Sequence, residues 1–291
     1  MITEHKCTQS FNLTIKCPDT LGIVAAVSTF LANEKAFITE SSHFGDLDTG
    51  TFFMRTVFNS ASAKPIEHNA IKEKFSKIAR QFNMDWQIFN AQERIKTIIA
   101  VSKFGHCLND LLHRVKIGSI PIDICGVVSN HETFRDLVEW HGIRFHHIPI
   151  NRNNKSDQEA KLLSLFSETS SELLVLARYM QILSQNTCER LSNRIINIHH
   201  SFLPGFKGAR PYHQAHSRGV KIIGATAHYV TADLDEGPII EQAVERVDHT
   251  FSPKGLVNLG QDMENTVLAR AVKWHAEKRV LVNGTKTVVF R

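Results

Sequence analysis

From residue 95 onward the chain alternates short apolar segments with amphipathic ones, and this alternation restricts its fold more than any other feature. The apolar segments have the length of buried strands, and the amphipathic segments have the spacing of helices. Such alternation predicts right-handed strand–helix–strand units and a mainly parallel sheet covered on both faces, as in Rossmann-like folds. The expected strands are residues 96–101, 122–128, 145–150, 173–177, 195–199, 224–231 and 239–247, and the expected helices are residues 108–115, 132–140, 156–166, 182–191 and 262–278. Ser156 and Glu159 also have the spacing of a capping box at a helix start.

About the first ninety residues follow a different order, strand–helix–strand–strand–helix–strand, which is typical of a ferredoxin-like domain. The expected strands are residues 11–16, 36–43, 51–58 and 85–89, and the expected helices are residues 21–33 and 66–82. The turn at residues 18–24 resembles the first turn of an ACT domain, a module that often binds amino acids or mediates oligomerisation. Its residues suit a plain strand-to-helix turn equally well, in which Asp19 or Thr20 caps the helix. We expect an ACT-like regulatory or oligomerisation domain at residues 1–90 and a catalytic domain at residues 91–291.

Composition assigns a broad class and excludes others. A hydrophobic fraction of 42% with 22% charged residues is ordinary for a globular protein. The net charge of +5 comes without a long basic run, so it does not favour nucleic acid and is compatible with small anions. The first residues lack the apolar core of a signal peptide, and apolar runs stay well short of the roughly 20 residues that span a bilayer. We therefore expect a cytoplasmic protein that binds neither nucleic acid nor membrane.

Cysteine usage points to the same compartment. The five cysteines are odd in number, widely scattered and free of C-x-x-C spacing. This pattern fits reduced thiols and argues against a disulfide framework or a thiolate zinc site.

Three polar residues near strand ends are candidates for acyl chemistry. The strand expected to end at His199 alternates, so Asn197 and His199 share one face, at the sheet edge where such folds bind ligands. Asp235 lies in the polar loop between the next two expected strands. An amide can bind a developing oxyanion, an imidazole can assist it, and a carboxylate can orient the imidazole or take a water proton. Each residue alone would suit a structural role, and only the three together indicate catalysis.

The motifs around these residues resemble those of the folate-dependent formyltransferase family. Its members carry an Asn-x-His motif before a Ser-Leu-Leu-Pro-like turn, and a later Asp in an Asp-x-Gly-Pro loop. Here the turn reads Ser201-Phe202-Leu203-Pro204 and the loop reads Asp235-Glu236-Gly237-Pro238. Further stretches narrow the resemblance to the branch that hydrolyses 10-formyltetrahydrofolate to tetrahydrofolate and formate: residues 206–215, 224–230 and 235–242. The resemblance runs from about residue 10 to the closing stretch at residues 283–290.

The resemblance implies roles for individual residues. Asn197 would donate to the formyl oxygen, His199 would stabilise the oxyanion or relay protons, and Asp235 would orient His199 and help to activate water. The segment that would line the pterin pocket comprises Arg178, Tyr179, Met180, Gln181 and Ile182, and His228 would support the site. Met180 and Ile182 would suit core packing as well. His200 is expected to point away from His199 and to be structural.

The resemblance also implies which partners the protein has. The folate is a small-molecule substrate and no cofactor is expected. We expect no metal, because adjacent histidines on a strand point to opposite faces and no His-Glu-x-x-His spacing is present. A homo-oligomer is expected, since ACT sheets commonly pair edge to edge, whereas the sequence leaves open whether an amino-acid effector binds that domain.

The first strand-to-helix turn of the second domain bears on the acceptor of the formyl group. Members that formylate glycinamide ribonucleotide have a glycine-rich turn there, which cradles the phosphate. Here Gly105 is the one glycine, and Lys103, Phe104 and His106 would obstruct a phosphate. Water is therefore the expected acceptor.

Other functions stay open at this point. A formyltransferase to a small amine is the nearest alternative, with a sugar nucleotide or initiator methionyl-tRNA as further acceptors. The tRNA version would be expected to add a basic RNA-binding domain. A metallohydrolase and an amino-acid sensor with an inactive second half are more distant alternatives.

Overall fold

The computed structural model describes residues 9–60, 66–151, 153–205 and 211–291, which form two compact units. The first unit is Met1–Arg94 together with Glu277–Leu281 and Val288–Arg291. The second is Ile95–Ala276 together with Val282–Thr287. Two short C-terminal segments that we expected in the second domain therefore group with the first unit. Residues 206–210, part of one motif stretch, lie outside the described residues.

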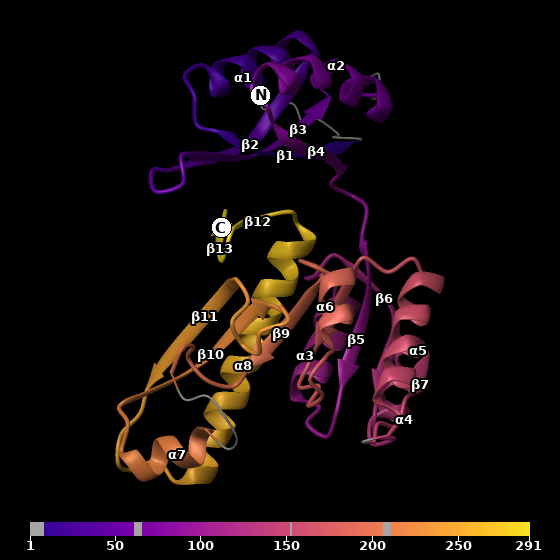
Figure 1. The fold of residues 1–291 in the computed structure, drawn as a ribbon, viewed down its shortest axis with the longest axis vertical. Helices are drawn as coiled ribbons and strands as arrows, with labels where there is room; N and C mark the ends of the chain where they lie inside the picture. The colour runs from indigo at the N-terminus through magenta and orange to yellow at the C-terminus, as the bar shows by residue number, and fades with distance from the viewer. Residues whose placement is uncertain (1–8, 61–65, 152, 206–210) are drawn as a thin grey trace, which may run out of the picture. The chain divides into compact units, whose positions relative to one another are not determined.

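The first unit has the strand and helix order expected for a ferredoxin-like domain (Figure 1). Its elements are β1 (Ser10–Pro18), α1 (Ile23–Asn33), β2 (Ala36–Asp46), β3 (Thr51–Ser60), α2 (His68–Gln81) and β4 (Asp85–Asn90). The strands form an antiparallel sheet in the order β2-β3-β1-β4, and α1 and α2 cover one face of it. The helix α1 begins after Gly22, and neither Asp19 nor Thr20 is its cap.

Alternation along β1 explains the two faces of this sheet. Phe11, Leu13 and Ile15 are fully buried and belong to the core that the sheet shares with α1 and α2. Asn12, between them in sequence, is also buried, but its side chain lies in a polar cluster with Arg55 of β3. One face of the sheet is therefore apolar, and the other carries buried polar groups.

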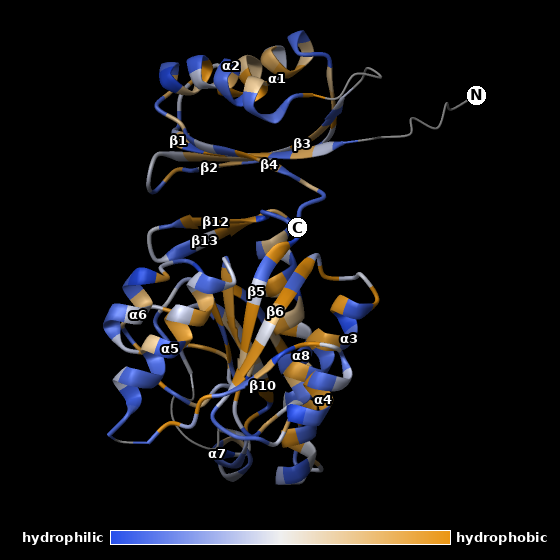
Figure 2. Ribbon diagram, turned by 90° about the vertical axis from the view of Figure 1, so that its right-hand side faces the viewer, coloured by the Kyte–Doolittle hydropathy of each residue, from blue (hydrophilic) through white to orange (hydrophobic). Residues whose placement is uncertain are grey.

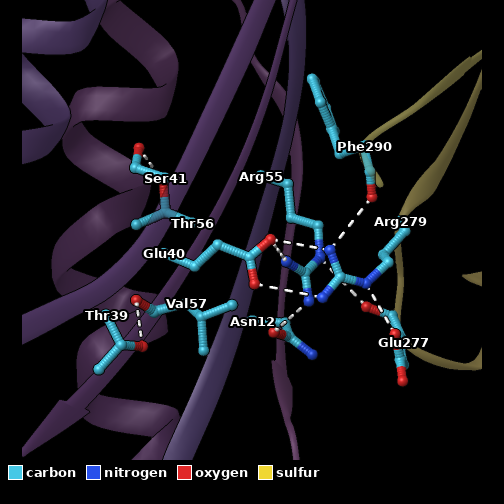
Figure 3. A network of polar contacts seen from close by, with 10 residues as sticks. All are labelled: Asn12, Thr39, Glu40, Ser41, Arg55, Thr56, Val57, Glu277, Arg279 and Phe290. Atoms are coloured by element: carbon cyan, nitrogen blue, oxygen red, sulfur yellow. Dashed lines mark hydrogen bonds and ion pairs between the residues drawn. The ribbon is translucent and has the colours of Figure 1, made fainter.

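The polar face holds the end of the chain through a cluster of charges (Figure 3). Arg55 Nη1 donates to Glu40 Oε1 at 2.7 Å, and Arg55 Nε donates to the Glu277 carbonyl at 3.1 Å. Arg279 donates to the same Glu40 oxygen at 2.8 Å and to the Phe290 carbonyl at 3.1 Å. One carboxylate on β2 thus joins an arginine of the sheet to an arginine of the C-terminal segment.

The second unit is built on a seven-stranded sheet in the order β11-β10-β9-β8-β5-β6-β7 (Figure 1). Its strands are β5 (Ile95–Val101), β6 (Ile122–Ser129), β7 (Phe145–His147), β8 (Leu173–Leu176), β9 (Ile195–His199), β10 (Ile222–Tyr229) and β11 (Ile239–Arg246). The pairs among β5 to β9 are parallel, whereas β10 runs antiparallel to β9 and to β11. Strand β8 is buried along its whole length, as expected for a parallel sheet covered on both faces. The central strands β5 and β6 of the same sheet are coloured mainly as hydrophobic in Figure 2.

Helices cover both faces of this sheet. They are α3 (His106–Lys116), α4 (Arg135–Trp140), α5 (Lys155–Glu168), α6 (Gln185–Arg190), α7 (Pro211–Arg218) and α8 (Pro253–Ala276), and a hairpin of β12 (Val280–Asn283) and β13 (Lys286–Val289) ends the chain. Helices α5 and α6 contribute to one core with the central strands, while α8 packs on β9, β10 and β11. The expected α/β fold class is confirmed. Among the described residues, no helix is both long enough and apolar enough to cross a membrane.

The expected capping box at the start of α5 is wrong. The helix begins at Lys155 after Asn154, so Ser156 already lies inside it. Glu159 instead accepts hydrogen bonds from Ser184 N at 3.1 Å and from Thr187 Oγ1 at 2.7 Å. The carboxylate of Glu159 therefore binds residues that are distant in sequence and does not cap its own helix.

Candidate active site

A cavity of about 820 Å³ opens in the second unit at the carboxyl ends of its parallel strands. Its walls come from the loops that follow β5, β8 and β9, from the loop between β10 and β11, and from α8. The chain leaves β5 towards β6 on one side, whereas β8 lies on the other, so the topology switches beside β5. Ligands of open α/β sheets bind at such a switch point.

Asn197 and His228 face each other across neighbouring strands at this cavity. They are directly paired in the register of β9 and β10, and Asn197 Nδ2 lies 3.2 Å from His228 Nε2. His228 Nδ1 lies 2.8 Å from the Tyr229 carbonyl, which can only accept, so Nδ1 carries the proton and Nε2 is an acceptor. Burial lowers the pKa of His228, which keeps its ring neutral. His228 Nε2 therefore accepts one N–H of the Asn197 amide, and the second N–H stays available for another acceptor.

The side chains of His199 and Asp235 contact each other on the same wall. His199 is 6% exposed, and its Nδ1 lies 3.3 Å from Asp235 Oδ2. His199 Nε2 has no hydrogen-bond partner among the residues that the structure describes. The contact with His199 lowers the pKa of Asp235 below its ordinary value, so the carboxylate is ionised. Asp235 thus contacts Nδ1 of His199, and Nε2 stays available to a ligand.

The loop that carries Asp235 is fixed by a close backbone approach. Asp235 itself has φ 59°, a left-handed conformation that is uncommon for a residue other than glycine. At Gly237 an added Cβ would lie 1.7 Å from the Tyr229 carbonyl oxygen, so only glycine fits there. Tyr229 N also donates to the Pro238 carbonyl at 2.9 Å. The Asp-Glu-Gly-Pro sequence therefore allows the loop to fold tightly against the end of β10.

The segment expected to line the substrate pocket borders the same cavity along its whole length. Its members are Arg178, Tyr179, Met180, Gln181 and Ile182, and His228 joins them. Met180 and Ile182 are 54% and 59% exposed, whereas Tyr179 is 6% exposed and belongs to the core. Burial, followed by the charge of Glu159, raises the pKa of Tyr179 to about 12.

Ser102 fixes the backbone of this segment. Its N donates to the Arg178 carbonyl at 3.2 Å, and its Oγ accepts from Met180 N at 3.0 Å. The same Oγ donates to Asn130 Oδ1 at 2.7 Å. The ends of β5 and β6 thus hold Arg178, whose φ is 63°.

Comparison with known proteins assigns the family. A model of the family described as Formyl transferase matches residues 95–272, more than half of the chain. The chain belongs to the formyl transferase family. The expected resemblance is thereby confirmed.

Relatives separate into two groups within the formyl transferase family. A formyltetrahydrofolate deformylase of Corynebacterium sp. (strain P-1) is 52% identical over 96% of this chain and 97% of its own. The structure of a formyltetrahydrofolate deformylase from Burkholderia mallei is 51% identical, with a TM-score of 0.93 over 97% of this chain and 100% of its own. The structure of glycinamide ribonucleotide transformylase 1 from Symbiobacterium toebii is 28% identical, with a TM-score of 0.64 over 68% of this chain and 95% of its own. The chain is thus more similar to the deformylases, along nearly its whole length.

One prediction about this formyl transferase site is wrong. His200 was expected to point away from His199, but the two rings stack with centroids 5.2 Å apart, and both border the cavity. The strand ends at His199, so the alternation of a strand does not extend to the next residue. Burial and then the charge of Arg178 lower the pKa of His200 to about 4, so this ring is neutral near pH 7.

A buried carboxylate that was not among the predicted site residues also borders this cavity: Glu264 of α8, which is 1% exposed. Its Oε2 lies 2.8 Å from His106 Nε2 and 3.4 Å from Arg178 Nε, and its Oε1 accepts from Tyr212 OH at 2.8 Å. Burial alone would raise the pKa of Glu264, but His106 and Arg178 more than offset it and lower that pKa. A charge between the apolar residues Met263 and Val267 was the available signal, because those neighbours lie on the buried side of α8.

His106, Cys107 and Glu264 are the group of potential metal ligands found among the described residues, with ligand atoms within 4.8 Å of one another. The Cys107 thiol is buried, and burial raises its pKa well above the ordinary value, so it is protonated. The other two side chains already form a hydrogen bond with each other. The donors thus satisfy one another, and the absence of a metal remains a prediction.

Proposed function

We propose that the protein hydrolyses 10-formyltetrahydrofolate to tetrahydrofolate and formate, at a site formed by Asn197, His199 and Asp235. The observation that carries the proposal is the convergence of an amide, an imidazole and a carboxylate from two separate parts of the chain on one wall of the cavity. The relatives named formyltetrahydrofolate deformylase support the reaction, because they match nearly the whole chain at 39–52% identity.

Hydrolysis of an N-formyl group requires three tasks, and each has a candidate in this cavity. Water attacks the formyl carbon, and the carbonyl oxygen becomes an oxyanion that needs a donor. Asn197 supplies that donor through the N–H that His228 does not use. His199 exchanges protons at Nε2, first with the attacking water and then with the folate nitrogen that leaves. Asp235 keeps the proton of His199 on Nδ1 and stabilises the charged ring.

The apolar rim of the cavity suits the ring system of a folate. Met180, Ile182 and Leu234 border the cavity and are each more than half exposed. Flat heteroaromatic ligands are commonly held between such side chains, while nearby backbone groups fix their orientation. We assign the segment from Arg178 to Ile182, with His228, to substrate binding.

Water as the acceptor is supported by the residues that fill the turn after β5. Phe104 and His106 both border the cavity, and the guanidinium of Arg178 lies 5.5 Å from the centre of the Phe104 ring. An added Cβ at Gly105 would lie 2.3 Å from the Phe134 ring, so this glycine serves packing. The turn is therefore occupied by side chains where an acceptor molecule would need space.

The decisive experiment incubates the purified protein with 10-formyltetrahydrofolate and no amine, and follows formate and tetrahydrofolate. Equal amounts of both products, lost in Asn197→Ala and Asp235→Asn, would support the hydrolase and its site. Turnover that begins only after a small amine is added would replace the proposal with a formyltransferase. Activity that disappears after exhaustive chelation and returns with a divalent metal would overturn the metal-free mechanism.

We further propose that the first unit is an ACT-like domain that mediates homo-oligomerisation and binds an amino-acid effector. Support comes from its ferredoxin-like sheet and from large apolar side chains exposed near edge strand β2, including Phe37, Phe44 and Leu47. Light scattering after size exclusion tests the first point, and a strictly monomeric protein would contradict it. Titration with single amino acids while formate release is followed tests the second, and a flat response to all of them would contradict it.

We also propose that the protein acts in the cytoplasm. Cys17, Cys107, Cys125 and Cys188 are free thiols, which suits a reducing compartment. Fractionation of cells that carry a tagged chain tests this location, and recovery in a secreted or membrane fraction would contradict it.

A further inference from the structure

Glu159 of α5 is a buried carboxylate that the proposed chemistry does not use. It is 6% exposed, and both of its carboxylate oxygens accept a hydrogen bond from Ser184 N at 3.1 Å. Its Oε2 also accepts from the hydroxyls of Ser184 and Thr187. Lys155, one turn earlier on the same helix, brings a positive charge to 3.9 Å from Oε1. Glu159 thus binds the residue at which α6 begins, because Ser184 is the N-cap of that helix.

A buried carboxylate is not in itself a stabilising feature. Its removal from water is unfavourable, and well-packed apolar side chains often replace such groups without loss of stability. The cap of α6 does not require it either, since Thr187 N donates directly to Ser184 Oγ at 3.3 Å. A fully bonded buried network does make one local geometry rigid, because any displacement leaves donors without an acceptor. The effect of Glu159 is therefore geometric: it fixes the position of Ser184.

Ser184 directly follows a stretch of cavity wall that has no hydrogen bonds of its own. Residues 181–183 border the cavity, and among the described residues none forms a hydrogen bond with their backbone groups. On the other side of this stretch, Ser102 binds the Arg178 carbonyl and Met180 N. Ser102 and Glu159 thus fix the two ends of the segment assigned to substrate binding, and the backbone groups between these ends are unpaired.

Unpaired backbone groups beside a cavity bind a ligand well only when they are already in place. Backbone N–H and C=O groups are strong hydrogen-bonding groups, and ligand pockets use a few of them to fix the orientation of a flat ring. A stretch without internal hydrogen bonds depends on its ends for its shape, and any ordering that is left until binding weakens the affinity.

We propose that Glu159 is a positioning residue for substrate binding. It fixes the Ser184 end of the segment, so that the backbone groups of residues 181–183 meet the folate without rearrangement. This inference deepens the proposed function, and it rests on the assignment of that segment to the folate.

This role separates substrate binding from catalysis. Asn197 and His199 lie on β9, and Asp235 lies in the loop between β10 and β11, so a change at Glu159 leaves the proposed catalytic groups in place. The loss of an interaction that is equal in the ground state and the transition state raises KM and leaves kcat unchanged. Glu159 should therefore affect the affinity for the folate and not the rate at saturation.

The test measures binding of tetrahydrofolate, the proposed product, by calorimetry to wild type, Glu159→Ala and Glu159→Gln. Alanine leaves the donors of Ser184 and Thr187 without their acceptor, so we expect the dissociation constant to rise at least about tenfold. Glutamine keeps one carbonyl oxygen, so its dissociation constant should rise less, by at least about threefold. With 10-formyltetrahydrofolate as substrate, KM should rise in the same order, while kcat stays within about twofold of wild type.

Glu168→Gln is the matched control, because Glu168 is exposed at the end of the same helix and its charge should not affect the affinity. Thermal unfolding and the stoichiometry of binding report the folded fraction of each variant. Glu159→Gln, which keeps the shape of the side chain, carries the test if Glu159→Ala does not fold.

Two results would overturn the inference. One is a pair of variants that bind tetrahydrofolate as tightly as wild type and differ only in stability or stoichiometry, which is what a purely structural role predicts. The other is a fall in kcat at unchanged affinity. A wild type that binds tetrahydrofolate but releases no formate would instead contradict the proposed hydrolysis, which the binding measurement does not require.

Discussion

Asn197 of β9 lies directly opposite His228 of β10, with the amide nitrogen 3.2 Å from His228 Nε2. The Tyr229 carbonyl fixes the proton of His228 on Nδ1, so the acceptor Nε2 determines which end of the Asn197 amide faces it. The pairing therefore orients a hydrogen-bond donor by means of a neutral histidine on the neighbouring strand.

Replacement of Asn197 by alanine should reduce formate release about a hundredfold, the usual effect of losing one oxyanion donor. The loss should appear in kcat more than in KM, because the hydrogen bond strengthens as the oxyanion forms. Asn258→Ala is the control, since Asn258 is exposed on α8. Steady-state kinetics with 10-formyltetrahydrofolate measures both variants, and a tenfold rise in KM at constant kcat would contradict the assigned role.

Replacement of Asp235 by asparagine should lower kcat by at least about a hundredfold. The reason is that an amide stabilises a charged His199 less than a carboxylate does, and it is a weaker hydrogen-bond acceptor for the N–H at Nδ1. The lowered pKa of Asp235 means that this carboxylate stays ionised to below its ordinary range. The contribution of Asp235 to activity should therefore be present above that lowered value and be lost as the pH falls through it. Glu236→Gln removes the same charge from the exposed neighbour and should retain most of the activity. Equal losses in both variants would show that loop charge alone matters.

Replacement of Gly237 by alanine should displace the loop that carries Asp235, since the new Cβ would lie 1.7 Å from the Tyr229 carbonyl oxygen. We expect the free energy of unfolding to fall by about 1–3 kcal/mol, as for overpacked sites, and kcat to fall with it. Gly255→Ala is the control, because its Cβ would meet its nearest neighbour at 3.5 Å, an ordinary contact. Urea unfolding and formate release measure the two effects, and a Gly237→Ala variant with full activity would contradict the role of this close approach.

The parts of the site that could be predicted from sequence are those governed by local pattern. Alternation in β9 placed Asn197 and His199 on one face, and the structure has both at the cavity. The Asp-Glu-Gly-Pro sequence predicted a turn, and the tight loop beside Tyr229 contains it. The strand order was predicted only as far as parallel units, because β10 and β11 pair antiparallel through contacts that periodicity does not encode.

The parts that could not be predicted depend on partners distant in sequence. Helix α8 begins at Pro253, earlier than the expected residue 262, which places Glu264 well inside the helix and not in its first turn. Its partners His106 and Arg178 come from two other loops, and only the assembled sheet brings them together. Glu159 shows the same effect, since Ser184 and Thr187 are its partners and not its own helix start.

The neutral state of His200 should make the protein less stable in mild acid. In the unfolded chain His200 takes up a proton near its ordinary pKa of 6.5, whereas the folded site resists protonation until about pH 4. The unfolded state therefore binds more protons in this window, and the stability that the neutral ring contributes is lost as the pH falls from about 6.5 to about 4. Between pH 6.5 and pH 5 this amounts to about 2 kcal/mol.

Urea unfolding of wild type and His200→Gln at pH 7, 6 and 5 measures this loss. The groups that act on His200 from its surroundings are Arg178, His199, Glu264 and Asp235, and all of them remain in the variant. The difference between the two proteins therefore isolates His200. The free energy of unfolding of His200→Gln should change less with pH than that of wild type. An equal change in both proteins would contradict the prediction.

Glu40 should stabilise the first unit because its carboxylate forms ion pairs with two arginines. It accepts from Arg55 at 2.7 Å and from Arg279 at 2.8 Å, and the Arg55 side chain is only 4% exposed (Figure 3). Glu40→Gln leaves the two positive charges facing each other, so the free energy of unfolding should fall by about 2 kcal/mol, less than the ~3–5 kcal/mol for a fully buried pair. Glu73→Gln, at an exposed position on α2, is the control.

A double-mutant cycle with Arg279→Gln then tests whether the C-terminal segment is held through this carboxylate. If it is, the two substitutions together should cost less than the sum of the single effects, with a coupling of at least about 0.5 kcal/mol, because each removes the same contact. The pKa of Glu40 is lowered, since the two arginines more than offset its partial burial, so its contribution is present above the ordinary carboxyl range and is lost as the pH falls through the lowered value. Strictly additive effects at pH 7 would mean that Arg279 is held by Glu277 and the Phe290 carbonyl alone.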